Sequence, residues 1–506
     1  MRFRATPTVA KLGSNIFLNF AGSAWLAVLT VAITPVQVHY LGVEAYGFVA
    51  LISILQVVFS TLDLGISATV TKVVSSDHSA GRADSALTIS TAATLYWSIA
   101  VIIAALLWFN AAAFANVWLT RTSLDPATVI LGIKIIAVYL GFRWPVAFYT
   151  GVISGLQRMD VLNFVKAGVY SLRMLGSVVV LILVPDLLAF LLWFAFSSAV
   201  EIVVYAVATH RLMPAMDMRL RFSLTSIKDI WKYSATMNVI ALTALVLSQA
   251  DRIAVTKLLS LEALGYYSIA YNAAIAISLA QSAINGASFP AFSHSHSSND
   301  NGALMMRYAK ASELMGFIVA LPCFTLVFFG SEILELWINS KVASETAPAM
   351  ALLALGFFFN AMVSSAYVIA IACGRPSLPL WVNLLALLVY VPTLYVLIGL
   401  YGIFGAALAY AGLNFYYFFS LLPLVQAKVL GQKTGAWLAA NLYPFAAIGV
   451  CALGGMKAVT LVTGPGWVSW IALSCGAALY VIIALRCMSV GLRSDLLAMA
   501  RKAYIR

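Results

Sequence analysis

Charged residues are scarce in this chain. Only 9% of its 506 residues are Asp, Glu, Lys or Arg, whereas 63% are hydrophobic, and an average soluble domain is about 25% charged. A water-soluble fold cannot hide that much apolar surface. Because a bilayer core about 30 Å thick takes about 20 apolar residues per helix, the composition predicts an all-α polytopic membrane protein without a soluble domain.

Catalytic and metal-binding patterns are also lacking. No GxSxG, HExxH or P-loop pattern occurs. The five cysteines are scattered without CxxC pairs, which favours a packing role. His294 and His296 are two residues apart and would face opposite ways on a helix. We therefore expect neither an enzyme nor a metal or organic cofactor.

Apolar windows separated by short polar loops predict about fourteen spans. They lie at roughly 14–38, 46–69, 87–110, 128–154, 163–184, 187–209, 233–257, 264–288, 312–336, 347–372, 380–399, 402–424, 435–457 and 467–487. The predicted organisation is an N-lobe (1–210), a cytoplasmic interlobe linker (211–232), a C-lobe (233–425), and two accessory helices with a cytoplasmic tail (426–506).

The net charge of +12 comes from basic residues whose distribution along the chain matches the predicted topology. With the N-terminus in the cytoplasm, most Lys and Arg residues fall on the inner side, among them Arg2, Arg219 and the tail from Arg486, while few, such as Arg121 and Lys341, fall outside. This bias predicts that both termini are cytoplasmic. The inner charges suit lipid headgroups, and no basic-aromatic module suggests nucleic acid.

A short pattern occurs twice. Leu41-Gly-Val-Glu-Ala-Tyr-Gly-Phe48 and Leu259-Ser-Leu-Glu-Ala-Leu-Gly-Tyr266 share L-x-x-E-A-x-G-aromatic, 218 residues apart, and Gly155-Leu-Gln-Arg158 has a weaker echo at Gly374-Arg375. Two halves of six helices each have the same orientation in the membrane. We therefore expect two lobes related by a pseudo-twofold axis along the membrane normal, facing a central cavity.

These residues carry a resemblance to a known family. The pattern from Leu41 to Gly47, the sequence Asp63-Leu-Gly-Ile66, and the stretch from Gln249 to Tyr266 resemble the O-antigen and exopolysaccharide flippases of the multidrug, oligosaccharidyl-lipid and polysaccharide exporter superfamily. The resemblance covers helices one to twelve. It implies a V-shaped, two-lobed, MATE-like bundle that alternates between inward-open and outward-open states.

The resemblance also implies a cargo and a location. The cargo would be an undecaprenyl-diphosphate-linked oligosaccharide, moved from the cytoplasmic to the periplasmic leaflet of a bacterial inner membrane. Coupling to H⁺ or Na⁺ is implied, and a glycan polymerase and a chain-length protein are further candidate partners.

Four basic residues lie within or at the edge of spans four and five: Lys134, Arg143, Lys166 and Arg173. Each ionisable group in hydrocarbon costs about 2.5–3.5 kcal/mol on insertion scales, and neither span contains an acidic residue. Guanidinium groups bind phosphate bidentately, so we expect unpaired Arg143 and Arg173 near the midplane to hold the diphosphate. The lysines would mark its path; the alternatives are snorkelling, capping of carbonyl groups, or pairing with Asp63 or Asp251 from another helix.

Two acidic residues are candidates for coupling or gating. Asp251 and its neighbour Arg252 would point about 100° apart on a helix and so need separate partners. Asp251 is a candidate coupling or gating carboxylate, with an interlobe salt bridge as the alternative, and Arg252 is a candidate cargo contact. Asp63, before Gly65, is a candidate cation or proton site, with capping or pairing as the alternative.

Amide side chains are a further candidate group, since they could bind sugar hydroxyls or tie helices together. They include Asn15, Asn19, Asn238, Gln249, Asn272, Gln281, Asn285 and Asn360.

Three other functions remain open. A multidrug or small-cation antiporter of the same fold would need an acidic cavity, and a membrane-embedded glycan ligase or polymerase would need large outer loops. A flippase for the peptidoglycan precursor is the third alternative.

Overall fold

The computed structural model describes residues 9–61, 63, 65–80, 86–119, 121–214, 223, 242–243, 245–464 and 466–495, whose regular elements are all helices. The helices of the first half are α1 (Val9–Thr61), α2 (Ile66–Ala80), α3 (Ala86–Phe109), α4 (Ala111–Trp118), α5 (Pro126–Arg143), α6 (Val146–Gly155), α7 (Met159–Leu183) and α8 (Leu187–Leu212). Residues 245–258 are also helical. The second half contains α10 (Leu261–Ala274), α11 (Ile277–Ser297), α12 (Asn301–Trp337), α13 (Ser340–Ala372), α14 (Ser377–Val425), η1 (Gln426–Leu430), α15 (Thr434–Asn441), α16 (Tyr443–Gly449), η2 (Val450–Gly454), α17 (Gly455–Thr463) and α18 (Trp467–Cys487).

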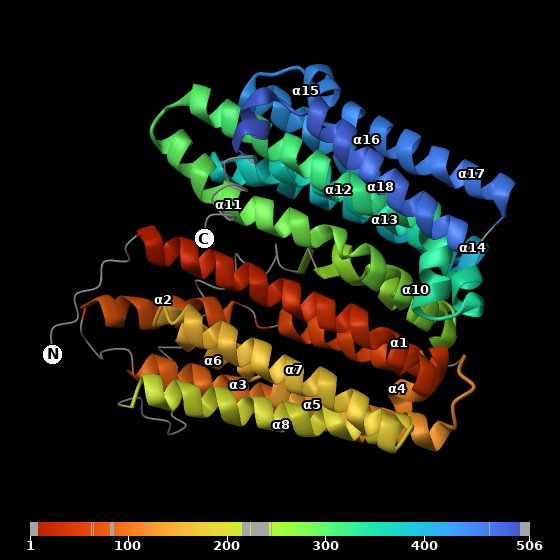
Figure 1. Ribbon diagram of the computed structural model, residues 1–506. Helices are drawn as coiled ribbons and strands as arrows, with labels where there is room; N and C mark the ends of the chain where they lie inside the picture. The colour runs from red at the N-terminus through yellow and green to blue at the C-terminus, as the bar shows by residue number, and fades with distance from the viewer. Residues whose placement is uncertain are drawn as a thin grey trace. The chain divides into compact units, whose positions relative to one another are not determined.

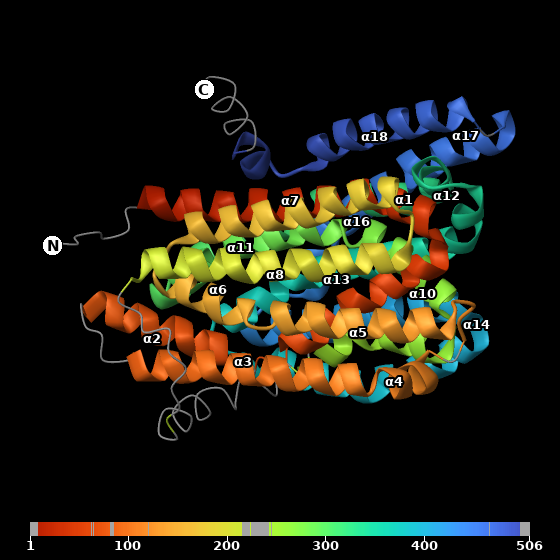
Figure 2. The ribbon, with the colours of Figure 1, turned by 90° about the horizontal axis from the view of Figure 1, so that it is seen from below.

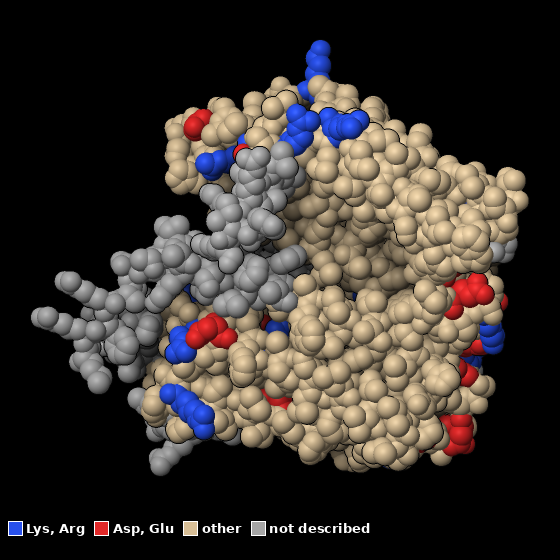
Figure 3. All heavy atoms as spheres, viewed as in Figure 1, with Lys and Arg blue, Asp and Glu red and all other residues tan. Residues whose placement is uncertain are grey.

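The predicted all-α membrane class is confirmed. Ten described helices are long and apolar enough to cross a bilayer, or eleven if the bent pair α10 and α11 forms one span. Most charged side chains visible in Figure 3 lie toward the ends of the helices, with a broad uncharged area between them. Helices suit the hydrocarbon core of a bilayer because they satisfy every backbone polar group without water. The count of fourteen stays a prediction.

The contacts divide the chain into two compact units, Met1–Ser268 and Ile269–Arg506. In the first unit α1 packs on α7, α5 on α8 and α2 on α6; in the second, α13 packs on α12 and α14. Within each unit the long helices run side by side (Figures 1 and 2). The predicted domain boundaries stay predictions. Arg2, Arg219, Asn238, most of the predicted linker and the end of the tail lie outside the described residues, as do the side chains of Asn15 and Asn19.

Two of the long elements each consist of two helices that meet at a glycine. Gly42 interrupts α1 with a φ of 77°, and Gly402 interrupts α14 with a φ of 57°. Glycine adopts such angles without the steric cost that a Cβ brings. The break at Gly42 falls between predicted spans one and two, and the break at Gly402 falls at the first residue of predicted span twelve.

The ends of α6 and α13 have the same backbone geometry. The Arg158 N–H donates to the carbonyl oxygen of Ile153 (3.2 Å), and the Arg375 N–H donates to that of Ala370 (2.9 Å). In each case the residue before the arginine has a positive φ, 57° or 70°. This hydrogen bond over six residues is the Schellman closure of a helix C-terminus. The weaker sequence echo therefore reflects a repeated structure.

The two copies of the L-x-x-E-A-x-G-aromatic pattern, 41–48 and 259–266, contact each other reciprocally within the first unit. A Cβ added to Gly47 would overlap the carbonyl oxygen of Leu261, and a Cβ added to Gly265 would overlap that of Val43. Val43 and Leu261, like Gly47 and Gly265, are 218 residues apart. A contact that reads the same from both partners is what a twofold relation produces. The repeated glycines thus let the two segments touch backbone to backbone.

The connection between α4 and α5 binds both repeated segments. Thr122 Oγ1 and the Ser123 N–H donate to Glu44 at 2.7 and 2.6 Å. Arg121 Nη1 donates to the carbonyl oxygen of Leu258 at 2.9 Å. This connection therefore reinforces the backbone contact beside it.

We expect Gly47→Val and Gly265→Val each to destabilise the protein by about 1–3 kcal/mol, because the new Cβ meets a backbone oxygen that no rotamer change can move. Thermal unfolding of the purified protein measures the effect. Gly168→Ala in α7 is the matched control, since a Cβ there has no neighbour within 4 Å. Unfolding temperatures for the valine variants equal to that of the control would contradict the assigned contact.

Candidate functional site

The candidate site begins where α5 gives way to α6. The two helices form one apolar stretch, Pro126–Gly155, and Pro145 separates them. Proline lacks the N–H that would continue the helical hydrogen bonds. Arg143 is the last residue of α5 and lies near the middle of this stretch. A guanidinium group is therefore held at mid-depth, at a break in the span.

Glu201 of α8 pairs with both arginines. Arg143 Nη1 donates to Glu201 Oε1, and Arg173 Nη2 donates to Glu201 Oε2 at 2.5 Å. The expectation of unpaired arginines is therefore wrong. Spans four and five contain no carboxylate, but the neighbouring helix supplies one near the middle of Leu187–Leu212. Two guanidinium groups share one carboxylate, so the cluster keeps a net charge of +1.

Arg173 is fixed on every side. Its side chain is only 4% exposed, and its Nε donates to Ser197 Oγ at 2.9 Å. The guanidinium carbon also lies 5.5 Å from the ring centre of Tyr139 and 5.9 Å from that of Phe194, distances at which a cation is attracted to an aromatic face. Arg173 therefore holds Glu201 in place from within the helix packing.

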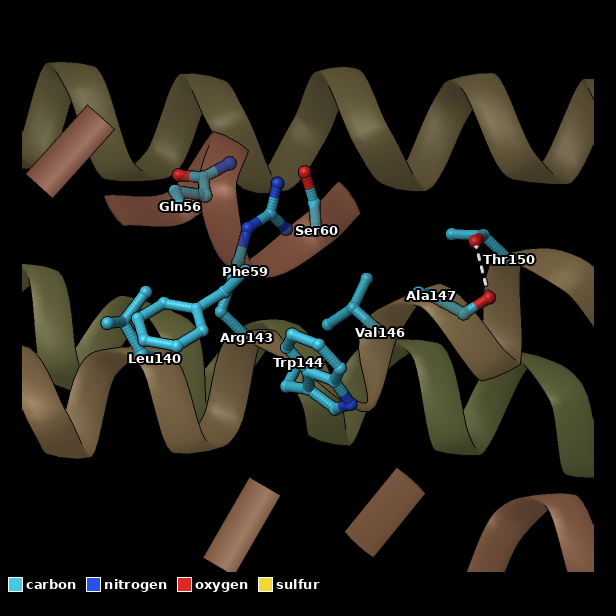
Figure 4. A pocket seen from close by; sticks show the side chains of 9 residues that line it. All are labelled: Gln56, Phe59, Ser60, Leu140, Arg143, Trp144, Val146, Ala147 and Thr150. Atoms are coloured by element: carbon cyan, nitrogen blue, oxygen red, sulfur yellow. Dashed lines mark hydrogen bonds between the residues drawn. The ribbon is translucent and has the colours of Figure 1, made fainter. Parts of the chain in front are cut away.

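Arg143 is the accessible member of the cluster. Its side chain is 26% exposed, and it reaches between Gln56 and Ser60 into a pocket of about 190 Å³ (Figure 4). Pockets that hold a whole small ligand measure about 300–1,000 Å³, so this one suits a single group of a larger molecule. Nine residues of α1, α5 and α6 and the turn between α5 and α6 line it: Gln56, Phe59, Ser60, Leu140, Arg143, Trp144, Val146, Ala147 and Thr150.

The polar lining favours an anion. None of the lining residues is acidic. The Tyr139 hydroxyl donates to Gln56 Oε1 at 2.7 Å, which leaves the amide nitrogen of Gln56 as a donor. Together with the guanidinium of Arg143, the pocket presents hydrogen-bond donors and a positive charge, the combination that binds phosphate or carboxylate groups.

The two lysines lie outside this pocket. Lys134 Nζ is 5.6 Å from the ring centre of Trp108 on α3, so it lies where α3 packs on α5. Lys166 is exposed on α7, seven residues before Arg173. A role for either residue in guiding cargo stays a prediction.

Asp251 is fully buried in the helical segment 245–258. Its Oδ2 accepts a hydrogen bond from the Tyr267 hydroxyl at 2.7 Å, and its Oδ1 has no hydrogen-bond partner among the described residues. Arg252 Nη2 donates to the carbonyl oxygen of Ser248 at 3.4 Å. The neighbouring charges thus have separate contacts, and their functional roles stay predictions.

Asp63 lies between α1 and α2 and has the contacts of a helix cap. Its Oδ2 accepts from the Ser67 N–H at 3.2 Å, and its Oδ1 accepts from the Tyr96 hydroxyl of α3. Such bonds satisfy a donor at the start of α2. Binding of a proton or cation by Asp63 stays a prediction.

Glu201 is absent from the predicted site, although it carries the same signal as the arginines. It is a lone ionisable residue within an apolar stretch, and such residues are retained at a cost in hydrocarbon. If this cost had been considered for acidic as well as basic residues, Glu201 would have been predicted as a site residue.

The fold is one that solved membrane transport proteins also have. The chain is similar to the lipid II flippase MurJ in an inward-closed conformation, with a TM-score of 0.74 and 14% identity over 92% of this chain and 97% of that one. It is also similar to an inward-facing multidrug resistance MATE family transporter of the MOP superfamily, with a TM-score of 0.67 and 12% identity over 79% of this chain and 94% of that one. This chain therefore has the multi-pass helical fold that these transporters share.

Residues 12–296 match the family described as "Polysaccharide biosynthesis protein", and the chain belongs to this family. A relative in Shigella flexneri, named "Putative O-antigen transporter", is 20% identical over 302 residues, which cover 58% of this chain and 69% of the relative. The chain is therefore a multi-pass membrane protein of the polysaccharide biosynthesis family.

We expect Glu201→Ala to destabilise the protein by about 3–5 kcal/mol, since it leaves two guanidinium groups without their counter-ion. Arg173→Ala should cost less and Arg143→Ala least, because one arginine then still pairs with Glu201 and Arg143 is already partly exposed. Unfolding temperatures of the purified variants check this order.

Arg158→Ala is the control for this series, because its pair with Asp160 is exposed and such pairs contribute about 0–1 kcal/mol. An unfolding temperature for Glu201→Ala as high as that of Arg158→Ala would refute the shared ion pair.

Proposed function

We propose that this protein is a flippase for an undecaprenyl-diphosphate-linked oligosaccharide. It moves the headgroup from the cytoplasmic to the periplasmic leaflet of a bacterial inner membrane by alternating access, while the polyprenyl tail stays in lipid. Both termini lie in the cytoplasm. A glycan polymerase and a chain-length protein would use the exported unit. The proposal is supported by the family, by the flippase fold and above all by the pocket around Arg143.

Because two arginines share the carboxylate of Glu201, one of them, Arg143, is able to bind an anion. The Arg143, Glu201 and Arg173 cluster carries one excess positive charge, so a phosphate group can bind Arg143 without removing the last counter-ion from Glu201. Arg173, which is buried and held by Ser197, continues to neutralise the carboxylate. The cost of an isolated buried charge, several kcal/mol, is thereby avoided in both the empty and the occupied site. Arg143 binds the phosphate of the cargo, and Arg173 holds Glu201 in position.

The peptidoglycan precursor is the second candidate cargo, since the MurJ fold covers 92% of this chain. Lipid II and lipid-linked oligosaccharides share a polyprenyl diphosphate, so the pocket around Arg143 serves either one. The family match favours the oligosaccharide. An organic cation is disfavoured because no lining residue is acidic and one is a guanidinium.

Asp251 is the proposed coupling residue. A buried carboxyl group with a hydroxyl as its partner is able to gain or lose a proton when access alternates, whereas an ion pair would hold it in one state. Its Oδ1 has no partner among the described residues and is the atom where a proton or Na⁺ would bind. The two ions are distinguished by which imposed gradient drives transport.

We expect Arg143→Ala to abolish export of the surface polysaccharide while the protein remains in the membrane, because Glu201 keeps Arg173 as its partner. Arg143→Lys should retain part of the export, since a lysine keeps the charge and loses the bidentate geometry. Arg173→Ala should reduce the amount of folded protein instead. Surface polysaccharide and membrane protein level are measured in the same cells.

Arg158→Ala is the control for export, since Arg158 is exposed at the end of α6 and lies outside the pocket. Normal surface polysaccharide in the Arg143→Ala strain would contradict the proposal that Arg143 binds the phosphate of the cargo.

We expect Asp251→Asn to fold normally, because an asparagine still accepts the hydrogen bond from Tyr267, and to lose its response to an imposed proton gradient. Transport by reconstituted vesicles with and without a pH difference measures this. Asp186→Asn is the control, since Asp186 is exposed and caps α8. Equal stimulation of wild type and Asp251→Asn by the pH gradient would disprove proton coupling at this position, and a response to Na⁺ alone would assign the other ion.

A further inference from the structure

The pocket around Arg143 offers hydrogen-bond donors at one end only. The hydroxyl groups of Ser60 and Thr150 each donate to a carbonyl oxygen of their own helix, both at 2.9 Å, and a hydroxyl has only one hydrogen to give. The indole nitrogen of Trp144 is buried. Among the lining side chains, the Arg143 guanidinium and the Gln56 amide are therefore the groups that can donate to a ligand.

The rest of the lining is hydrocarbon. Its apolar side chains are Phe59, Leu140, Trp144, Val146 and Ala147. The rings of Phe59 and Trp144 pack edge to face with 6.2 Å between their centres, so each holds the other in place. In Figure 4, Val146 and Ala147 lie on the other side of the guanidinium from Gln56. The pocket thus passes from a cationic end to an apolar wall.

The volume of the pocket exceeds what a phosphate needs. Its 190 Å³ equals about six water molecules at about 30 Å³ each. A phosphate group takes the space of about two, which leaves about two-thirds of the pocket beside the apolar wall. Sugar hydroxyls would lose their hydrogen bonds to water there. The chemistry that fits is a phosphate with hydrocarbon bonded directly to it.

This requirement separates two kinds of membrane lipid. A bilayer consists mainly of phospholipids, and a cation alone would bind their phosphates as well. In a phospholipid the phosphate is bonded to a glycerol that carries polar ester groups, whereas in a polyprenyl lipid it is bonded to an isoprene unit. Burying a polar group without a hydrogen bond is unfavourable. The apolar wall therefore favours the isoprene over the glycerol ester.

We propose that Phe59, Val146 and Ala147 are specificity-determining residues that bind the isoprene unit next to the phosphate, so that the pocket selects polyprenyl phosphates over phospholipids. The inference rests on the proposed function and adds which phosphate of the cargo Arg143 holds, namely the one bonded to the lipid. The second phosphate and the sugars then lie outside the pocket, and the rest of the tail stays in lipid.

Two lipids test this selection. Undecaprenyl phosphate and phosphatidic acid are both phosphate monoesters on long hydrocarbon chains, and they differ in the group that joins the two parts. Their affinities are measured in phosphatidylcholine nanodiscs for wild type and for variants of the pocket. Val146→Thr keeps the shape of the wall and adds a hydroxyl, and Ala147→Leu fills the space beside it. Ala113→Leu is the matched control, because Ala113 is exposed on α4 outside the pocket.

We expect the wild type to bind undecaprenyl phosphate about tenfold more tightly than phosphatidic acid, since the ester groups lose their hydrogen bonds at the wall. Val146→Thr should reduce this preference about threefold or more, and Ala147→Leu should weaken undecaprenyl phosphate about tenfold, because overfilled sites are unfavourable. Arg143→Ala should weaken both lipids, and Ala113→Leu neither.

Equal affinities of the wild type for the two lipids, or a preference that both wall variants retain, would overturn the selection by the wall and leave the phosphate role of Arg143 intact. Failure of the wild type to bind either lipid would overturn it as well. Normal export of surface polysaccharide by the Arg143→Ala strain would in addition reject the proposed function.

Discussion

The first unit is organised around one constraint: Glu201, Arg143 and Arg173 must share their charges, because Glu201 and Arg173 are buried among apolar helices. Each isolated ion would cost several kcal/mol, yet the cluster is not neutral. One carboxylate between two guanidinium groups leaves a single positive charge, and the burial of Arg173 determines that this charge faces the pocket through Arg143. The break at Pro145 places Arg143 where it can do so. Stability and the anion recognition that we propose would therefore depend on the same three side chains.

The internal repeat provides a framework whose two copies carry different side chains. Gly47 and Gly265 contact each other's segments reciprocally, and α6 and α13 end in the same backbone geometry. The polar clusters among the described residues differ between the two units. The described cluster near the middle of the first unit is ionic, whereas Gln281, Asn360 and Asn414 form an uncharged chain of hydrogen bonds in the second unit.

The comparison with MurJ and MATE transporters shows that one helical fold accommodates different cargoes. Function then resides in the side chains that a particular chain presents. In this chain the pocket near Arg143 combines a cation with an amide donor and lacks an acid. Those features agree with the membership of the polysaccharide family and with the anionic cargo that we propose.

Composition and spacing alone determine the helical membrane class and most of the spans, because hydrocarbon forces each apolar segment to satisfy its own backbone hydrogen bonds. The repeated L-x-x-E-A-x-G pattern can also be read directly from the sequence. Arg143 and Arg173 also stand out, since any charge in an apolar run is conspicuous. Their partner does not follow from the sequence. Glu201 lies 58 residues beyond Arg143, and which side chains meet depends on the rotation and neighbours of each helix. The same holds for Asp251 with Tyr267 and for Gln281 with Asn360, whose partners only the packed helices decide.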